Sequence, residues 1–340
     1  MPITRRSVLR FTAAAPAIVL ASRLGSANAA TTLKISHQFP GGTITEGDFR
    51  DRMCRMFAEE IGKRSKGSLA AEVYPNSSLV KTVAQFSAIR KGALDMTLYP
   101  LNYAGGEVPE VNIGFMPAVV SSYEQGYKWK TAEIGKRMTN LLADKGVVLV
   151  SWLWQAGGAA SRGGPCLVPD DVKGKKVRGG SAEMDEMLKA AGASVVSMPS
   201  NELYAAMQTG AMDVAMTTAT SLISFRLEEL SKNLTVGRSK SFFFVFEPLL
   251  MSKQIFDGLS KDDQKLIMDV GLEMEKFGRD NAQADDNKVA QIYEKAGAKA
   301  TDLNQEQTDK WKALARESCW KTYAAKAPGC AEFLKLSQEV

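Results

Sequence analysis

Hydrophobic positions in the first half of the chain alternate between the spacing of a strand and the spacing of a helix. Apolar and polar residues alternate over 33–36, whereas Met53, Phe57 and Ile61 recur at the four-residue spacing of one helix face. Glycines follow the helical patterns, where helices commonly end. The pattern predicts strands over 33–36, 69–74, 94–98 and 147–153, and helices over 49–65, 83–91 and 128–145.

A second series of the same kind begins near residue 175. It predicts strands over 175–178, 194–198, 212–216 and 242–251, and helices over 182–191, 201–209 and 221–230. The remainder is almost entirely helical, with an unusually long helix over 261–295 and an interruption near 297–301. Strands that alternate with helices predict parallel sheets with crossover helices.

Two α/β series followed by long helices predict an α/β protein with two lobes and a cleft between them. We expect an N-lobe of residues 31–159 plus about 243–282, and a C-lobe of 160–242 plus about 283–340. Ligands of open α/β sheets bind beyond the carboxyl ends of the strands. The segments that follow predicted strands are therefore the candidate site: 37–38, 99–103, 154–162, 178–181, Ser200 and Thr217.

The first 29 residues have the order of an export signal. Arg5 and Arg6 precede an uncharged apolar stretch over 11–20, and Ala27-Asn28-Ala29 is a cleavage signal of small residues. Paired arginines resemble a twin-arginine signal peptide. A membrane anchor is the alternative, but the stretch is shorter than the roughly 20 residues that span a bilayer. We expect a cleaved signal peptide over 1–29, a periplasmic location, and no direct membrane insertion of the mature protein.

The charge balance changes when this segment is removed. It contains four arginines and no acidic residue, so cleavage lowers the net charge from +5 to about +1. The basic character of the whole chain therefore belongs largely to the signal, and we expect no nucleic-acid partner.

Cysteine and histidine are too few and too scattered for a zinc site. The chain has four cysteines, none in a CxxC pair, and a single histidine, His37. We expect no metal and no cofactor. A disulfide between Cys319 and Cys330 is the preferred use in an oxidising compartment, because Pro328-Gly329 lets the chain turn back between them. Cys54 and Cys166 are expected to be buried free thiols.

Enzyme motifs are missing from the sequence. It has no Walker loop, no GxGxxG and no GxSxG, and one histidine is a poor basis for a triad. Asp213 and Glu202 are the acids nearest the expected cleft, and a capping or turn role suits them better than a general base. The sequence thus favours a binding protein over an enzyme.

Two arginines are the most informative candidates. Arg178 ends a short predicted strand before Gly179-Gly180, and Arg162 lies in a glycine-rich loop predicted over 156–165. A guanidinium group matches a carboxylate with two parallel hydrogen bonds, and glycines let the backbone approach a ligand. A surface arginine is the alternative for either residue alone. Their positions in the expected cleft favour a clamp for a carboxylate.

Three runs of sequence together resemble a known family. Gly174-Lys175-Lys176-Val177-Arg178, then Gly192-Ala193, then the run from Glu202 to Asp213 resemble the solute-binding subunits of tripartite ATP-independent periplasmic (TRAP) transporters, of the C4-dicarboxylate-binding type. Residues 74–79 and 91–95 resemble its N-terminal lobe. The resemblance implies the two-lobed periplasmic binding protein fold.

The resemblance also implies a set of ligand-binding residues. Its carboxylate-pairing arginine falls on Arg178 and its second arginine on Arg162. Other cleft positions fall on Gln38 beside His37, on Tyr99 and Tyr103, on Ser200 and on Thr217.

Three departures from the family pattern bear on the ligand. Met216-Thr217-Thr218 replaces a stretch with glutamate, so a metal site built on that glutamate would be absent. Ser200 replaces an aromatic residue and opens space. A longer loop brings Trp152 and Trp154; Trp154 is a candidate for lining the pocket, with a place in the core as the alternative.

The implied function is capture of a small organic acid by closure of the cleft and delivery to the membrane permease subunits of a TRAP transporter. A periplasmic ligand-sensing component and, with less support, an enzyme acting on a small carboxylate are the alternatives. The sequence leaves monocarboxylates, dicarboxylates, and aromatic or hydroxy acids open.

Overall fold

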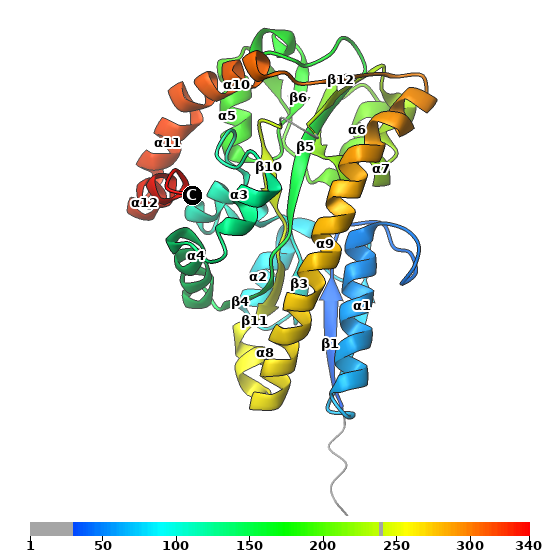
Figure 1. Cartoon of the computed structure of the whole chain (residues 1–340), viewed down its shortest axis with the longest axis vertical. Helices are drawn as coiled ribbons and strands as arrows, with labels where there is room; N and C mark the ends of the chain where they lie inside the picture. Colours follow the sequence, from blue (N-terminus) through cyan, green and yellow to red (C-terminus); the bar gives the residue numbers. More distant parts are fainter. Residues whose placement is uncertain (1–29, 238–240) are drawn as a thin grey trace, which may run out of the picture.

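The chain forms two lobes, each built around its own sheet, in a computed structural model that describes residues 30–237 and 241–340 (Figure 1). The long helix α9 (Lys261–Lys295) runs along both lobes. This confirms the predicted two-lobed α/β fold and the long helix. The predicted signal peptide lies outside the described residues.

The N-lobe sheet is five-stranded, with the order β2-β1-β3-β11-β4. Its first three strands are parallel, and β11 is antiparallel to its neighbours. Leu33 and Ile35 on β1 are fully buried, as the alternating pattern predicts. The strands are β1 (Thr31–Ser36), β2 (Leu69–Tyr74), β3 (Met96–Leu98), β4 (Val147–Ser151) and β11 (Leu249–Ser252). The helices are α1 (Phe49–Arg64), α2 (Gln85–Arg90), α3 (Tyr123–Lys128), α4 (Glu133–Asp144) and α8 (Lys253–Gly258).

The C-lobe sheet is seven-stranded, with the order β12-β9-β5-β8-β6-β7 and β10 paired with β5. Its strands are β5 (Trp154–Ser161), β6 (Lys176–Arg178), β7 (Ser194–Val195), β8 (Val214–Thr218), β9 (Asn233–Val236), β10 (Phe244–Phe246) and β12 (Lys299–Asp302). Its helices are α5 (Ala182–Ala190), α6 (Leu203–Gln208) and α7 (Ala219–Ser224). The strands β5, β9 and β12 were not predicted.

The glycine-rich segment predicted as a loop over 156–165 is largely strand β5. This prediction is wrong because the glycines serve close packing here rather than a turn. A Cβ atom on Gly157 would lie 1.8 Å from the ring of Phe243. Residues 154–159 consequently belong to the C-lobe sheet and not, as expected, to the N-lobe.

The single strand predicted over 242–251 is also wrong. It divides into β10, which pairs with β5 of the C-lobe sheet, and β11, which pairs with β3 and β4 of the N-lobe sheet. Glu247 and Pro248 separate the two strands, and proline has no N–H to continue a ladder. Residues 244–246 thus go with the C-lobe sheet, and the chain crosses between the lobes at Glu247-Pro248.

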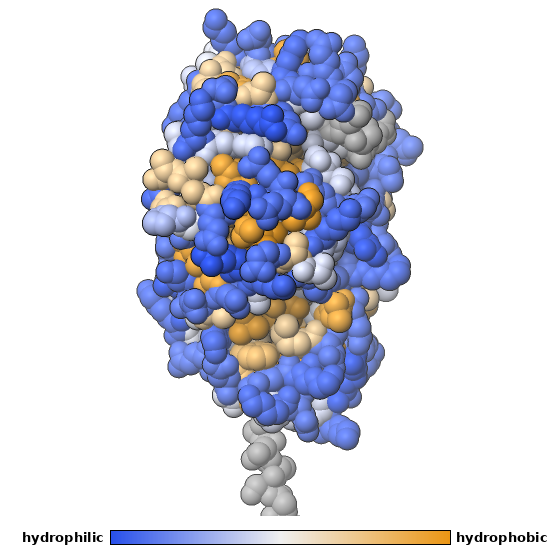
Figure 2. All heavy atoms as spheres, turned by 60° about the vertical axis from the view of Figure 1, so that its left-hand side comes forward, coloured by the Kyte–Doolittle hydropathy of each residue, from blue (hydrophilic) through white to orange (hydrophobic). Residues whose placement is uncertain are grey.

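The C-terminal helices contact both lobes instead of the C-lobe alone. They are α10 (Gln305–Glu317), α11 (Cys319–Lys326) and α12 (Pro328–Ser337). Helices α10 and α11 pack on α5, whereas α12 packs on α4 and on the 3-10 helix η3 (Pro109–Phe115). Trp320 Nε1 donates to the carbonyl oxygen of Pro117 at 2.8 Å. Polar residues cover most of this side of the molecule, with apolar patches between them (Figure 2).

All four cysteines are buried free thiols. The prediction is confirmed for Cys54 and Cys166, but the predicted disulfide between Cys319 and Cys330 is wrong. Cys319 begins α11 and donates to the carbonyl oxygen of Ala315 at 3.5 Å. Cys330 is near the start of α12, beside Tyr323. Helix α11 begins at Cys319 and extends about 12 Å to the turn that precedes α12. Cys330 lies just after this turn, at the opposite end of α11 from Cys319, and is therefore beyond the reach of a disulfide.

Among the described helices, none is both long enough and apolar enough to span a membrane.

Candidate functional site

Arg178 lies at the carboxyl end of β6, between the two lobes, and is 1% exposed. Its Nε donates to the carbonyl oxygen of Met198 at 3.0 Å and its Nη1 to that of Met216 at 2.9 Å. Its Nη2 donates to the hydroxyl of Tyr103 at 2.9 Å. No carboxylate of the described residues lies within ion-pair distance of it. A buried guanidinium held only by neutral acceptors is well suited to receive an anion.

Gly180 makes room for this guanidinium. Its φ angle is +101°, a backbone region that favours glycine, and a Cβ atom there would lie 2.5 Å from Arg178 Nη1. Gly180 therefore gives the guanidinium of Arg178 its space, a role that differs from the predicted close approach of the backbone to a ligand.

Tyr103 joins the two lobes at this point. Its hydroxyl oxygen accepts hydrogen bonds from Arg178 Nη2 and from the backbone N–H of Ser200, the latter at 3.1 Å. A phenolic hydroxyl has one hydrogen to donate, and neither of these bonds uses it. The ring of Tyr103 packs edge-on against Tyr99, with 5.9 Å between centroids. Tyr103 can thus donate to a ligand beside Arg178.

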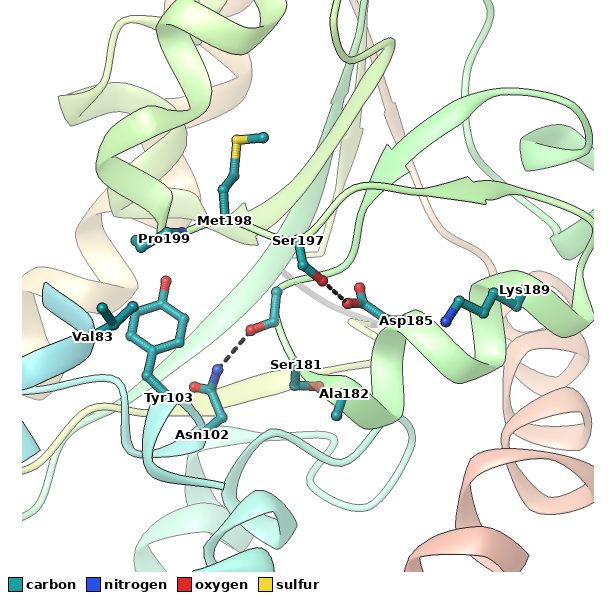
Figure 3. Close-up of a pocket in the computed structure, with 11 residues that line it drawn as sticks. Val83, Asn102, Tyr103, Ser181, Ala182, Asp185, Lys189, Ser197, Met198 and Pro199 are labelled. Atoms are coloured by element: carbon teal, nitrogen blue, oxygen red, sulfur yellow. Dashed lines mark hydrogen bonds between the residues drawn. The ribbon is translucent and has the colours of Figure 1, made fainter. Parts of the chain in front are cut away.

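A pocket of about 510 Å³ opens beside this contact (Figure 3). Asn102, next to Tyr103, donates through Nδ2 to the carbonyl oxygen of Gly180 at 2.7 Å, which adds a second bond between the lobes. Both lobes line the pocket: Val83, Asn102 and Tyr103 from the N-lobe, and Gly180, Ser181, Ala182, Asp185, Lys189, Ser197, Met198 and Pro199 from the C-lobe.

Further polar atoms at the lobe boundary have no hydrogen-bond partner among the described residues. They are both amide atoms of Gln38, the hydroxyl of Tyr99 and Oε1 of Gln155, and all three side chains are at most 1% exposed. Gln38 and Tyr99 follow the adjacent parallel strands β1 and β3. A buried polar group without a partner costs about 1–3 kcal/mol, so such groups mark sites that bind a ligand or water.

A second buried arginine, Arg50, lies in a charged network near the start of α1. It donates to both carboxylate oxygens of Asp48, at 3.0 and 2.8 Å, and through Nη1 to Ser221 of the C-lobe at 3.0 Å. The same Nη1 donates to Oε2 of Glu247 at 3.2 Å. Its guanidinium carbon lies 3.6 Å above the ring of Phe39. This network connects α1, α7 and the crossing between β10 and β11.

Glu247 is 3% exposed and also accepts a hydrogen bond from Gln155 Nε2. Burial raises the pKa of its carboxyl, against the lowering effect of Arg50 and Arg178. Sequence reasoning missed Arg50, Asp48 and Glu247. The signal that could have identified Glu247 was its charge, because the run 242–251 around it is otherwise apolar apart from Pro248.

The structure leaves three predicted residues outside the group around Arg178. His37 uses both ring nitrogens within the N-lobe: Nε2 lies 3.1 Å from Asp51, and Nδ1 accepts from the N–H of Phe39. Burial would raise the pKa of Asp51, but hydrogen bonds, chiefly those from His37 and Arg55, hold it below its usual value. The prediction that His37 binds ligand is wrong, because neither nitrogen is left for it.

Arg162 is exposed at the end of β5, and its N–H bonds to the carbonyl oxygen of Asp213 before β8. Strand β5 is antiparallel to β8, so the carboxyl end of β5, which carries Arg162, lies at the edge of the sheet opposite to the lobe boundary. The prediction of Arg162 as a second clamp is therefore wrong. Trp154 packs in the core between Trp129 and Phe246, with ring centroids 5.1 and 4.8 Å away, as the alternative interpretation expected.

Ser200 and Thr217 are buried near Arg178. The N–H of Ser200 bonds to Tyr103, and Thr217 follows Met216, whose carbonyl oxygen accepts from Arg178. Within the described residues, no group of three histidine, cysteine, aspartate or glutamate side chains is arranged to hold a metal ion.

Known proteins resemble this chain over most of its length. Residues 41–326 match the family described as bacterial extracellular solute-binding protein, family 7 (DctP). A solute-binding protein of Albidiferax ferrireducens is 62% identical over 309 residues, 91% of either chain. A crystal structure of a TRAP periplasmic solute-binding protein from Rhodoferax ferrireducens, with bound malonate, has a TM-score of 0.89 and 62% identity and covers 90% of this chain and 97% of that one. A TRAP protein from Sulfitobacter sp. NAS-14.1, with bound β-D-galacturonate, shares the fold at 21% identity, with a TM-score of 0.83 over 91% of this chain and 100% of that one.

Two lobes around a buried arginine that has no direct carboxylate partner among the described residues define the class of cleft-closing solute-binding proteins. The family match and the 62% identical relative show more: the chain belongs to the DctP family of TRAP periplasmic solute-binding proteins. This is a family of transport proteins and not a family of enzymes.

Proposed function

We propose that this protein captures a short organic acid between its lobes, with one carboxylate of the ligand on Arg178, and delivers it to a TRAP permease. The observation that carries the proposal is the buried guanidinium of Arg178, which has only neutral hydrogen-bond partners. Malonate is the first acid to test, because the 62% identical protein from Rhodoferax ferrireducens holds it. No catalytic step is part of the proposal.

Closure of the cleft would strengthen the binding. The acid enters an open cleft and its carboxylate meets Arg178, whose charge is permanent. The lobes then close, and Tyr103 and Asn102 reach across to Arg178, Ser200 and Gly180. Closure excludes water, which lowers the local dielectric constant and strengthens the ion pair.

The remaining cleft residues would hold the rest of the ligand. Tyr103 donates its free hydrogen to the carboxylate, and Gln38, Tyr99 and Gln155 supply their unpaired polar atoms to the distal end. Ser200 and Thr217 line the wall beside Arg178.

The hinge would lie where the chain crosses between the sheets. These crossings are 152–153 between β4 and β5, 247–248 between β10 and β11, and the middle of α9 near 282–283. The domain division follows from them, with 31–153 and about 247–282 in the N-lobe and 154–246 and about 283–317 in the C-lobe.

The cellular setting is part of the same proposal. A signal peptide over 1–29 would send the protein to the periplasm, where closure would present the bound form to the permease subunits. Capture for a sensor would use the same site, so the first test addresses binding itself.

Calorimetric titration of the ligand-stripped mature protein with malonate, succinate, acetate and the uncharged malonamide tests the proposal. Malonate is expected to bind at least 100-fold more tightly than malonamide. Arg178→Ala should abolish binding and Arg178→Lys should weaken it, because lysine lacks the planar fork. Arg162→Ala, on the exposed edge, is the matched control and should bind as the natural protein does. Equal affinity for malonamide, or unchanged binding in Arg178→Ala, would refute the clamp.

A further inference from the structure

Glu247 lies where two crossings between the lobes meet. Its backbone N–H donates to the carbonyl oxygen of Leu153 at 2.8 Å, which ties the crossing after β10 to the crossing before β5. Its side chain is almost fully buried, and Oε2 accepts from both Arg50 and Gln155. Among the described residues, none donates a hydrogen bond to the other oxygen, Oε1. That oxygen is free to carry a proton.

The positive charges of this buried layer are already matched by negative ones before any ligand is considered, and Asp185, buried in the pocket wall near Arg178, adds a further acid. Arg178 and Arg50 are positive, and Asp48 and Glu247 are negative when ionised; all four are at most 7% exposed. The nearby Asp51 is already paired with Arg55 and His37. Each ligand carboxylate therefore brings a further negative charge into a region that closure separates from water, and a dianion such as malonate brings two. A buried charge without compensation is strongly unfavourable, and a proton is the simplest compensation.

Glu247 can accept that proton at a smaller loss than the other acids of this layer. Asp185 accepts hydrogen bonds through both of its oxygens, from Gly179 and Ser197. Asp48 holds Arg50 through both oxygens and also accepts its backbone N–H at 2.8 Å. Glu247 has a single contact with Arg50. Burial and the negative charge of Asp48 raise the pKa of Glu247, whereas the positive charges of Arg50 and Arg178 lower it. When a carboxylate neutralises Arg178, one of the two groups that keep Glu247 ionised loses its effect.

We propose that Glu247 takes up one proton from solvent when an organic acid binds beside Arg178, so that the ligand is bound more tightly as the pH falls. The proton forms an O–H bond at Oε1, and Oε2 keeps its bonds to Arg50 and Gln155. The neighbours that face Glu247 are Arg50 and Asp48 of the α1 end, Arg178 of β6, Gln155 of β5 and Ser221 of α7, which bonds to the same Arg50 Nη1. This inference rests on the proposed function.

Titration calorimetry with malonate between pH 6.5 and 8.5, in buffers of different ionisation enthalpy, measures the protons taken up on binding. We expect uptake approaching one proton per malonate, and a Kd that rises by up to about tenfold per pH unit, the slope of a one-proton linkage. Glu247→Gln keeps a neutral, hydrogen-bonding side chain. It should bind malonate with little pH dependence, and more tightly than the natural protein at pH 8.5.

The variant also identifies the group that receives the proton. Uptake that persists in Glu247→Gln would assign the proton to malonate itself or to another residue and would overturn the inference. Glu124→Gln, measured in parallel, is the control for the loss of one acidic group. Glu124 is 78% exposed, so this substitution should leave the pH profile of binding unchanged. Thermal unfolding checks that both variants fold.

The two proposals fail in different ways. If malonate binds through Arg178 without proton uptake, the inference on Glu247 is wrong and the proposed function stands. If malonate does not bind at any pH, the proposed function fails for this acid, and the inference fails with it.

Discussion

Replacement of Tyr103 by phenylalanine tests whether closure depends on the hydroxyl that joins the lobes. This hydroxyl accepts from Arg178 Nη2 at 2.9 Å and from Ser200 N–H at 3.1 Å, and both donors belong to the other lobe. Both bonds cross the lobe boundary and would be broken in the open form that we propose. Tyr103→Phe should therefore weaken ligand binding and leave the unliganded, open protein nearly as stable as before.

The magnitude follows from the kinds of bond that are lost. A hydrogen bond to a charged group contributes about 1.5–3 kcal/mol and a neutral one about 1 kcal/mol, but both donors regain water in the open form. We expect a net loss of about 1.5–3 kcal/mol, or roughly 10- to 150-fold in Kd. Calorimetric titration with malonate measures it.

Tyr74→Phe provides the matched control, because its hydroxyl bonds to Glu72 on the exposed surface and should leave Kd unchanged. A Kd for Tyr103→Phe within twofold of the natural protein would refute the reasoning. So would an equal loss in the Tyr74 variant.

Three further predictions address stability. Burial raises the pKa of Asp286 to about 7, so the folded protein holds a proton that the unfolded chain releases near pH 4. The free energy of unfolding in urea should therefore fall between pH 4 and pH 7, by up to about 1.4 kcal/mol per pH unit. Asp286→Asn should flatten this slope. Gly157→Ala should destabilise the protein by about 1–3 kcal/mol or prevent folding, because the added methyl group would overlap the ring of Phe243. Gly163→Ala has open space around it and should change the urea midpoint little. Equal effects of the two substitutions would contradict the packing. Reduction should leave the Tm unchanged because Cys319 and Cys330 are free thiols, and a disulfide found between them by mass spectrometry would show the opposite.

Local patterns were sufficient for the elements in which one face is buried. The strands β1 and β2 and the helices α1 and α9 match their predictions closely, because alternation and four-residue spacing report directly on a half-buried surface. Fully buried strands were harder. Trp154–Ser161 is buried along its whole length and contains two glycines, so no alternation identified β5.

The sequence by itself determined the two-lobed α/β class and the identity of the main ligand-binding candidate, Arg178. Its position after a short strand and before two glycines carries the necessary information, since strand ends meet at the lobe boundary. Gln38, Tyr99 and Tyr103 were likewise predicted as candidates from their places after strands.

Only the tertiary structure decided which charged residues share the buried layer between the lobes. Arg50 and Glu247 are 197 positions apart, and their ion pair depends on how α1 and the β10–β11 crossing pack. The direction of β5 relative to β8 removed Arg162 from the site, and the length of α11 separated Cys319 from Cys330. Strand direction, helix length and contacts between distant segments are properties of the packed chain, and the periodicity of a short segment does not contain them.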